Sequence, residues 1–237
     1  MQTSHQPTLD RTHRIGLSLP PTTAPAGQDC PDIGALEQQA TTISVHKDAE
    51  LYAQGDPARY CYRIVAGCVR TVKLMDDGRR QINEFLLPGD WLGVEALAEH
   101  DLAAEAVTAV TVRRYPRRAL DQAAGHDCRV AHWLLGIASR QLRNARDRMV
   151  TLGRKSASER VAGFLLEMVD RVPHESAGHV PLPMSRGDIA DHLGLTIETV
   201  CRCLAQFRRD GTIALGRATF AVRSQAAMLA LARATRH

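Results

Sequence analysis

Residues Pro183 to Thr212 read PMSRGDIADHLGLTIETVCRCLAQFRRDGT, a stretch with two short helical patterns separated by a glycine. Ser185, followed three residues later by Asp188, is a capping-box-like start for the first helix. Gly194 predicts the end of that helix, and Thr196 is a candidate N-cap for the second. Two short helices joined by a tight turn that contains glycine predict a helix-turn-helix.

The apolar residues of this stretch give each helix one buried face. In the second helix Val200, Leu204 and Phe207 recur at steps of four and three residues, so they lie on one stripe. The inward face of the first helix is expected to consist of Ile189, Ala190 and Leu193. The opposite face of the second helix is therefore left free for a partner.

The exposed face of the second helix carries Glu198, Cys201 and Arg202. A guanidinium at 202 can bond both O6 and N7 of guanine, and a carboxylate at 198 can accept from cytosine N4, each pair giving about 1–3 kcal/mol of discrimination. The alternative is an exposed helical ion pair between Glu198 and Arg202, worth about 0.2–0.5 kcal/mol. The other candidate DNA-contact residues are Ser185, Arg186, Thr196, Ile197, Thr199, Arg208 and Arg209.

The segment GDIADHLGLTIETVCRCLAQF resembles the recognition unit of the CRP/FNR family of bacterial transcription factors. Its Glu198 and Arg202 match the E-x-x-S-R signature of the FNR and FixK branches, with Cys201 in the place of the serine. Two more segments are similar to the family, KSASERVAGFLLEM at 155–168 and LLPGDWLGVEAL at 86–97. They resemble the opening of its DNA-binding domain and a turn of its sensory barrel.

This resemblance covers about residues 30 to 225 and implies a function. A FixK-like member is a sequence-specific transcription regulator, commonly an activator, and is not an enzyme. It binds a palindromic double-stranded DNA site with TTGA-like half-sites as a homodimer, works with RNA polymerase, and controls low-oxygen or nitrogen metabolism. The sequence contains no cluster of acid, base and nucleophile that would indicate an enzyme instead.

The fold class expected for the chain is α+β, with four parts. Residues 1–29 are rich in Pro, Thr and Gln and predict a flexible arm. Residues 30–118 contain short β-branched runs broken by turn signals, which predict a β-barrel like those that bind cyclic nucleotides. Residues 119–152 predict a long dimerisation helix, and residues 153–237 a winged helix-turn-helix domain that begins with a hinge at 153–156.

The long helix predicted at 119–152 has an apolar stripe with two possible uses. Its members are Val130, Leu134, Ile137, Ala138, Leu142, Ala145, Met149 and Leu152. One face of the helix is expected to pack on the barrel and the other on the same helix of a second subunit. The alternative is a core helix of a monomer.

Charge and cysteine spacing limit the partners. The net charge is +4, and the excess lies in residues 153–237, with 12 basic against 8 acidic residues; a basic domain suits a polyanion. Cys30, directly after the predicted arm, is the one cysteine near the N-terminus, and the chain has no C-x-x-C pair, so no iron–sulfur cluster is expected. Cys201 is a redox-sensitive candidate beside Arg202, or else a passive replacement for serine.

The barrel segment lacks the pair of residues that would bind a phosphate. No Arg-Ser or Arg-Thr pair follows Gly93, and Glu105 would repel an anion, so no cofactor is expected. The alternative is an effector-dependent sensor that binds a cyclic nucleotide, or haem or nitric oxide through His100, His126 or His132. No apolar run of about 18 residues appears, so we expect a cytoplasmic protein without a membrane segment.

Overall fold

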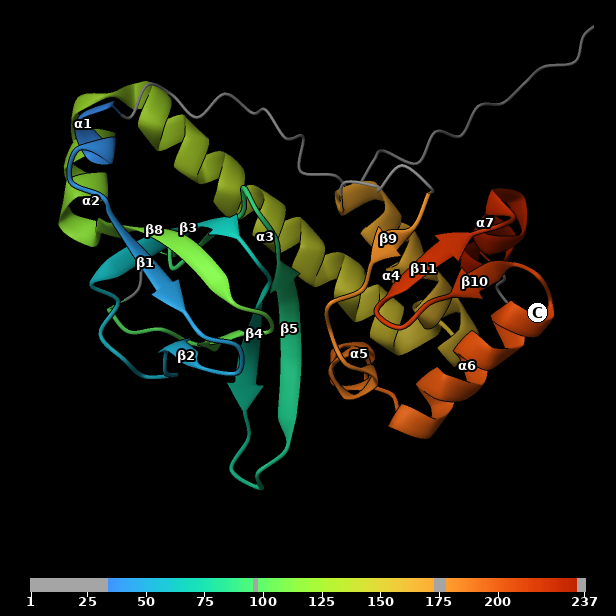
Figure 1. Ribbon diagram of the computed structural model, residues 1–237. Coiled ribbons are helices and arrows are strands. Elements are labelled where there is room, and N and C mark those ends of the chain that lie inside the picture. The colour runs from blue at the N-terminus through green and yellow to red at the C-terminus, as the bar shows by residue number, and fades with distance from the viewer. Residues whose placement is uncertain (1–33, 96–97, 173–177, 234–237) are drawn as a thin grey trace, which may run out of the picture.

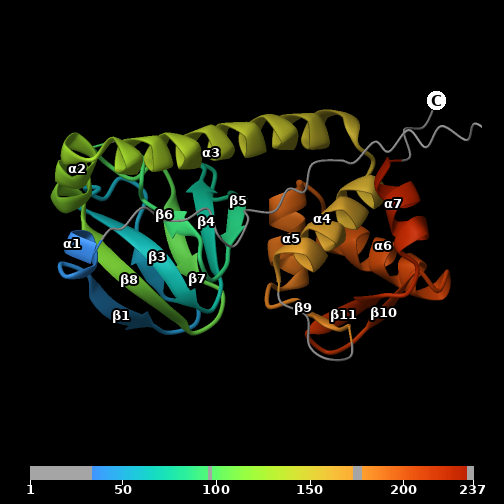
Figure 2. The same cartoon turned by 90° about the horizontal axis from the view of Figure 1, so that it is seen from above.

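The computed structural model describes residues 34–95, 98–172 and 178–233 and places an N-terminal barrel beside a C-terminal helical domain (Figure 1). The long helix α3 runs along one side of the barrel and reaches the C-terminal domain (Figure 2). The arm expected at 1–29 lies outside the described residues.

The barrel consists of two antiparallel four-stranded sheets, with strand orders β1-β8-β3-β6 and β2-β7-β4-β5. The short helix α1 (Gly34–Glu37) precedes them. The strands are β1 (Thr41–Val45), β2 (Glu50–Tyr52), β3 (Tyr60–Ala66), β4 (Val69–Leu74), β5 (Arg80–Leu86), β6 (Trp91–Leu92), β7 (Ala103–Ala106) and β8 (Val110–Pro116). Both sheets contribute apolar side chains to one core, because alternate residues of each strand point inward.

Aromatic side chains fill one side of the barrel interior. The ring of Tyr52 stacks on His100 with centroids 3.7 Å apart and on Tyr62 with centroids 5.6 Å apart. Burial lowers the pKa of His100 and raises that of Tyr52, so both rings are held neutral at neutral pH.

The helix expected at 119–152 is two helices, α2 (Arg117–His126) and α3 (Cys128–Arg154). Asp127 separates them in an extended conformation, and its carboxylate accepts a hydrogen bond from the N–H of Arg129 at 2.8 Å. The chain turns here because this carboxylate caps a new helix instead of continuing the old one.

The apolar residues of α3 lie on two faces, and the outer face includes Leu135, which the predicted stripe omitted. Val130 and Ile137 are buried on the barrel side. On the other face, Leu135, Leu142 and Met149 are 63%, 53% and 74% exposed and follow one another at seven-residue intervals. Three exposed alanines, at positions 131, 138 and 145, alternate with these residues at steps of four and three along the helix. This heptad face has no partner within the described chain.

The C-terminal domain begins after two extended residues, Lys155 and Ser156. A hinge of four residues was expected, but Gly153 and Arg154 continue α3. The helices are α4 (Ala157–Arg171), α5 (Arg186–Leu193), α6 (Ile197–Arg209) and α7 (Gln225–Arg233), and the strands are β9 (Val180–Pro181), β10 (Ile213–Leu215) and β11 (Thr219–Val222). The predicted wing is the pair β10 and β11, and the sequence patterns missed β9, which pairs with β11 over two residues.

The two domains share a hydrophobic core. Phe85 of β5 contacts the rings of Phe164 in α4 and His192 in α5, with centroids 6.0 and 5.0 Å apart. His192 is buried, and burial together with nearby Arg148 lowers its pKa well below the usual range. The outer face of β4 and β5 is therefore a docking surface for the helix-turn-helix.

Candidate nucleic-acid interface

The predicted helix-turn-helix is α5 and α6. Gly194 lies between them with φ +61°, a left-handed conformation that suits a residue without a Cβ. The N–H groups of Gly194 and Leu195 both donate to the carbonyl of Ala190, which closes α5. The turn is tight because the chain leaves one helix and enters the next within three residues.

The side chains expected to cap both helices are confirmed in that role. Ser185 Oγ accepts from the N–H of Asp188 at 3.0 Å, and Asp188 Oδ2 accepts from the N–H of Ser185 at 3.0 Å. Thr196 Oγ1 accepts from the N–H of Thr199 at 3.3 Å. These local bonds satisfy amides that have no partner inside a helix, so the sequence alone sets where the helices begin.

The two faces of α6 are divided as the residue spacing predicts. Val200, Leu204 and Phe207 are at most 2% exposed, and Cys203 is also buried. The opposite face presents Glu198, Cys201 and Arg202, with Ile197 51% exposed at its start. This exposed face of α6 therefore carries a carboxylate, a thiol and a guanidinium that can contact a partner molecule.

Glu198 and Arg202 are not joined to each other. Among the ion pairs of the described residues none connects them, which disfavours the helical ion pair. The pKa of Glu198 is lowered by hydrogen bonds from its own N–H and from the Thr196 side chain, which keep its carboxylate over the start of α6. Arg202 Nη2 donates to Thr199 Oγ1 at 3.4 Å, a long bond that leaves most donors of the guanidinium available.

Ser185 and Arg186 differ in what they can offer a partner. The Ser185 hydroxyl is exposed but donates to Asp188 Oδ2 at 2.8 Å, so its proton is already used. Arg186 is half-buried, and its Nη1 is a buried donor without a hydrogen-bond partner. Burial lowers the pKa of Arg186, and the electrostatic influence of Cys201 acts in the opposite direction.

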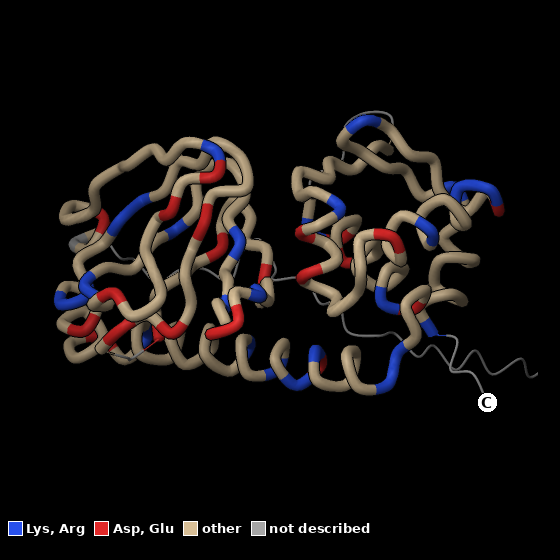
Figure 3. Tube along the Cα trace, turned by 90° about the horizontal axis from the view of Figure 1, so that it is seen from below, with Lys and Arg blue, Asp and Glu red and all other residues tan. Residues whose placement is uncertain are grey.

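Basic residues extend the exposed face beyond the first turns of α6. Arg208 and Arg209 are exposed at its C-terminal end, and Arg209 Nη2 donates to Gln206 Oε1 at 2.6 Å. Arg217 is exposed at the tip of the wing, a position that the sequence analysis did not select although the Gly216-Arg217 turn marks it. Lys and Arg recur along α3 and over the C-terminal domain (Figure 3).

The cysteines of the described chain fall into two classes. Cys61, Cys68 and Cys203 are buried, and burial raises the pKa of Cys68 to about 12. Cys128 and Cys201 are exposed. Cys30 lies outside the described residues, and within these residues no group of three His, Cys, Asp or Glu is placed to hold a metal ion.

Two domain families match the chain over its two structured parts. Residues 42–127 match the cyclic nucleotide-binding domain, and residues 159–231 match the Crp-like helix-turn-helix domain. In the part of the chain that the structure describes, every helix is too short or too polar to cross a membrane.

Three similar proteins extend over most of the chain. The nitrogen fixation regulation protein FixK of Bradyrhizobium diazoefficiens is 38% identical over 189 residues, which are 79% of this chain and 80% of that protein. The protein of the same name from Azorhizobium caulinodans is 43% identical over 71% of this chain and 69% of its own. The structure of FixK2 from Bradyrhizobium japonicum has a TM-score of 0.79 and 46% identity and covers 83% of this chain and 99% of that one.

Proposed function

We propose, from the premise that this chain belongs to the CRP/FNR family, that it binds palindromic promoter sites as a homodimer. The chain is a FixK/FNR-type transcription regulator with a helix-turn-helix DNA-binding domain, and it is not an enzyme. Beyond this, we propose which bases the protein reads, which surface joins its two copies and what role the barrel has.

The observation that carries the proposal is the free face of α6. Arg202 has donors available for guanine, and Glu198 can accept from cytosine, so each helix can read a G·C pair. A TTGA-like half-site contains one such pair. Arg208, Arg209 and the wing residue Arg217 are exposed cations that can neutralise phosphates on either side of the groove.

The heptad face of α3 supports the homodimer. Leucine or methionine at every seventh position, with alanine between, lets two such helices pack closely along a shared seam. A two-fold axis through this seam relates the two α6 helices, and two-fold binding matches half-sites about one helical turn apart.

The setting is a bacterial cytoplasm in which the dimer activates transcription together with RNA polymerase. The resemblance to FixK supports control of nitrogen or low-oxygen metabolism, and two relatives are named for regulation of nitrogen fixation.

A second candidate function is an effector-dependent sensor, which the match to the cyclic nucleotide-binding domain favours. One feature of the barrel weighs against a nucleotide. Tyr52, Tyr62 and His100 stack inside it, whereas Glu105 and Arg70 pair at 2.7 Å on the outer side of the sheet, toward the helix-turn-helix. We therefore propose that the barrel is a scaffold and that DNA binding needs no small molecule and no haem.

Purified protein is expected to bind a TTGA-type palindrome without additions. Affinity is measured by fluorescence anisotropy with and without cyclic AMP or cyclic GMP, and visible absorption is recorded for protein purified without oxygen. Unchanged affinity and a colourless protein are expected. A several-fold gain with either nucleotide, or a haem band, would instead support the sensor function.

Arg202→Ala is expected to remove discrimination between the palindrome and a scrambled duplex, by about 1–3 kcal/mol per half-site, because it deletes a base contact. Arg209→Ala is the matched control on the same helix. It should weaken both duplexes equally and reduce the slope of log affinity against log salt by about one. Full discrimination by the Arg202 variant in a mobility-shift titration would contradict the assignment of base reading to this residue.

Leu142→Glu is expected to weaken the dimer by at least about tenfold, or ~1.4 kcal/mol, because two carboxylates would face each other across the seam. Leu74 of β4 is 49% exposed, close to the 53% of Leu142, and lies off the heptad face, so Leu74→Glu is the control. Sedimentation equilibrium measures the dissociation constant of the dimer for both variants. Dissociation of the two variants to the same extent would exclude α3 as the seam.

Cys201 is proposed as a redox-sensitive residue within this interface. Peroxide treatment should lower affinity for the palindrome because a sulfenic or sulfonic acid adds bulk and polarity, or negative charge, where the DNA approaches. Cys201→Ser should resist this loss, whereas Cys128→Ser, which removes the other exposed thiol of the described chain, should not. Equal loss of affinity in all three proteins would leave Cys201 a passive serine replacement.

A further inference from the structure

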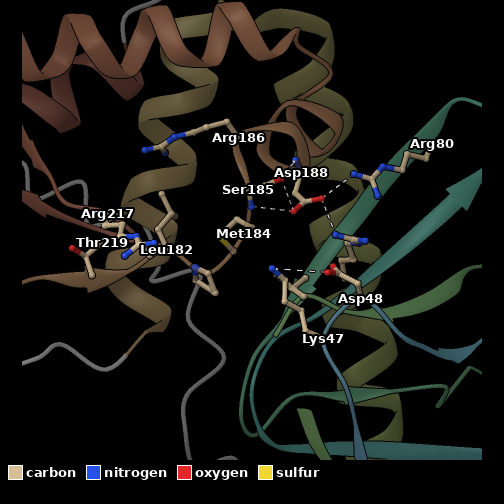
Figure 4. A pocket seen from close by; sticks show the side chains of 14 residues that line it. Lys47, Asp48, Arg80, Leu182, Met184, Ser185, Arg186, Asp188, Arg217 and Thr219 are labelled. Carbon is tan, nitrogen blue, oxygen red and sulfur yellow. Dashed lines mark hydrogen bonds and ion pairs between the residues drawn. The ribbon is translucent and has the colours of Figure 1, made fainter. Parts of the chain in front are cut away.

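The Asp188 carboxylate joins the helix-turn-helix to the barrel. Its Oδ2 accepts from the N–H and the hydroxyl of Ser185 at 3.0 and 2.8 Å, which caps α5. Its Oδ1 accepts from Arg70 Nη1 at 2.9 Å. It also accepts from Arg80 Nη2 at 2.9 Å (Figure 4). One side chain therefore starts α5 and also ties it to strands β4 and β5.

Two further acids complete an interdomain cluster. Glu105 of β7 pairs with Arg70 at 2.7 Å, and Asp191 of α5 pairs with Arg80 at 2.7 Å. The cluster thus consists of Arg70, Arg80, Glu105, Asp188 and Asp191. The side chains of Arg70 and Asp188 are 11% and 5% exposed, so solvent screens this pair far less than it screens a surface ion pair.

Hydrogen bonds from Gln81 and Arg148 hold the other end of α5. Gln81 Nε2 donates to the carbonyl of Asp191 at 2.6 Å and to that of His192 at 3.3 Å. Arg148 of α3 contacts the His192 ring through Nη1 at 3.0 Å. Because the barrel binds α5 at both ends, Arg148 of α3 contacts it at His192 and its apolar face lies in the shared core, α5 can neither slide nor rotate freely.

The position of α5 sets the position of α6. The tight turn at Gly194 and the packing of α6 against α5 leave the two helices one unit. Only Lys155 and Ser156 lie between α3 and α4, and Arg160 of α4 donates to the carbonyls of Leu152 in α3 and Leu193 in α5 at 2.7 and 3.0 Å. Together with the contacts at α5, these bonds fix the orientation of α6 relative to α3.

We propose that Arg70 and Arg80 of the barrel are positioning residues for DNA binding, which orient the recognition helix α6 through Asp188 and Asp191. This inference rests on the proposed function, in which α3 carries the two-fold axis. Two helix-turn-helix units at a fixed separation bind the second half-site at high effective concentration, whereas units that can rotate lose this advantage. The barrel thus contributes to palindrome affinity without touching a base.

The test compares a TTGA-type palindrome with a duplex in which one half-site is scrambled. The variants are Arg80→Gln, Asp191→Asn and the double substitution. Arg113→Gln is a closely matched control, because Arg113 pairs with Glu37 at 2.7 Å with side chains 31% and 36% exposed, against 2.7 Å and 34% and 32% for Arg80 and Asp191. That control pair lies entirely within the barrel part of the chain.

Arg80→Gln is expected to lower palindrome affinity about tenfold while changing half-site affinity less than about twofold. The double variant should match Arg80→Gln, because both changes remove the same pair, and Arg113→Gln should behave as the unmodified protein.

Equal losses on both duplexes would show damage to the helix-turn-helix itself and overturn the inference, as would no loss at all. Tighter palindrome binding by Arg80→Gln would show that the contacts between α5 and the barrel oppose DNA binding. That result would also overturn the inference. If the unmodified protein itself shows no preference for the palindrome over the half-site duplex, the proposed dimeric reading fails instead.

Discussion

Asp188 is a buried carboxylate whose hydrogen-bond partners come from both domains, so it links them. A buried charge is tolerated only when its oxygens are fully satisfied, and here the Ser185 cap uses one oxygen while Arg70 and Arg80 use the other. Breaking a buried pair by removing one partner costs about 3–5 kcal/mol, a large share of a total stability of about 5–15 kcal/mol. The start of α5 and its attachment to β4 and β5 are therefore maintained together.

The helix α3 has two apolar faces, of which one is buried in the described chain and the other is exposed. Val130 and Ile137 are buried against the barrel side, while Leu135, Leu142 and Met149 remain exposed on the other face. The extended residues at 155 and 156 separate α3 from the helix-turn-helix. Contacts between the domains, among them Arg70–Asp188 and Asp90–Arg171, hold the helix-turn-helix in its orientation relative to α3.

The barrel combines a fold that matches cyclic nucleotide-binding domains with an aliphatic core in which Tyr52, Tyr62 and His100 stack on one another. Glu105 lies on the outer side of this barrel. Its carboxylate neutralises Arg70, and Arg70 in turn reaches Asp188 in the helix-turn-helix. Strands β4 and β7 thus supply charged side chains to the interface between the domains.

The sequence by itself determined the features that depend on near neighbours. The caps at Ser185 and Thr196, the left-handed Gly194 and the buried and exposed faces of α6 follow from spacings of two to four residues. The break at Asp127 is also local, but the continuous apolar pattern obscured it.

Only the tertiary structure decided which partners the charged and apolar residues have. Arg70 and Asp188 are 118 positions apart in the chain, and each alone is an ordinary polar residue of a strand or a helix. Local patterns likewise could not separate the buried half of the α3 stripe from its exposed half. The physical reason is that ion pairs and burial depend on distance in space, which periodicity along a helix or strand does not specify.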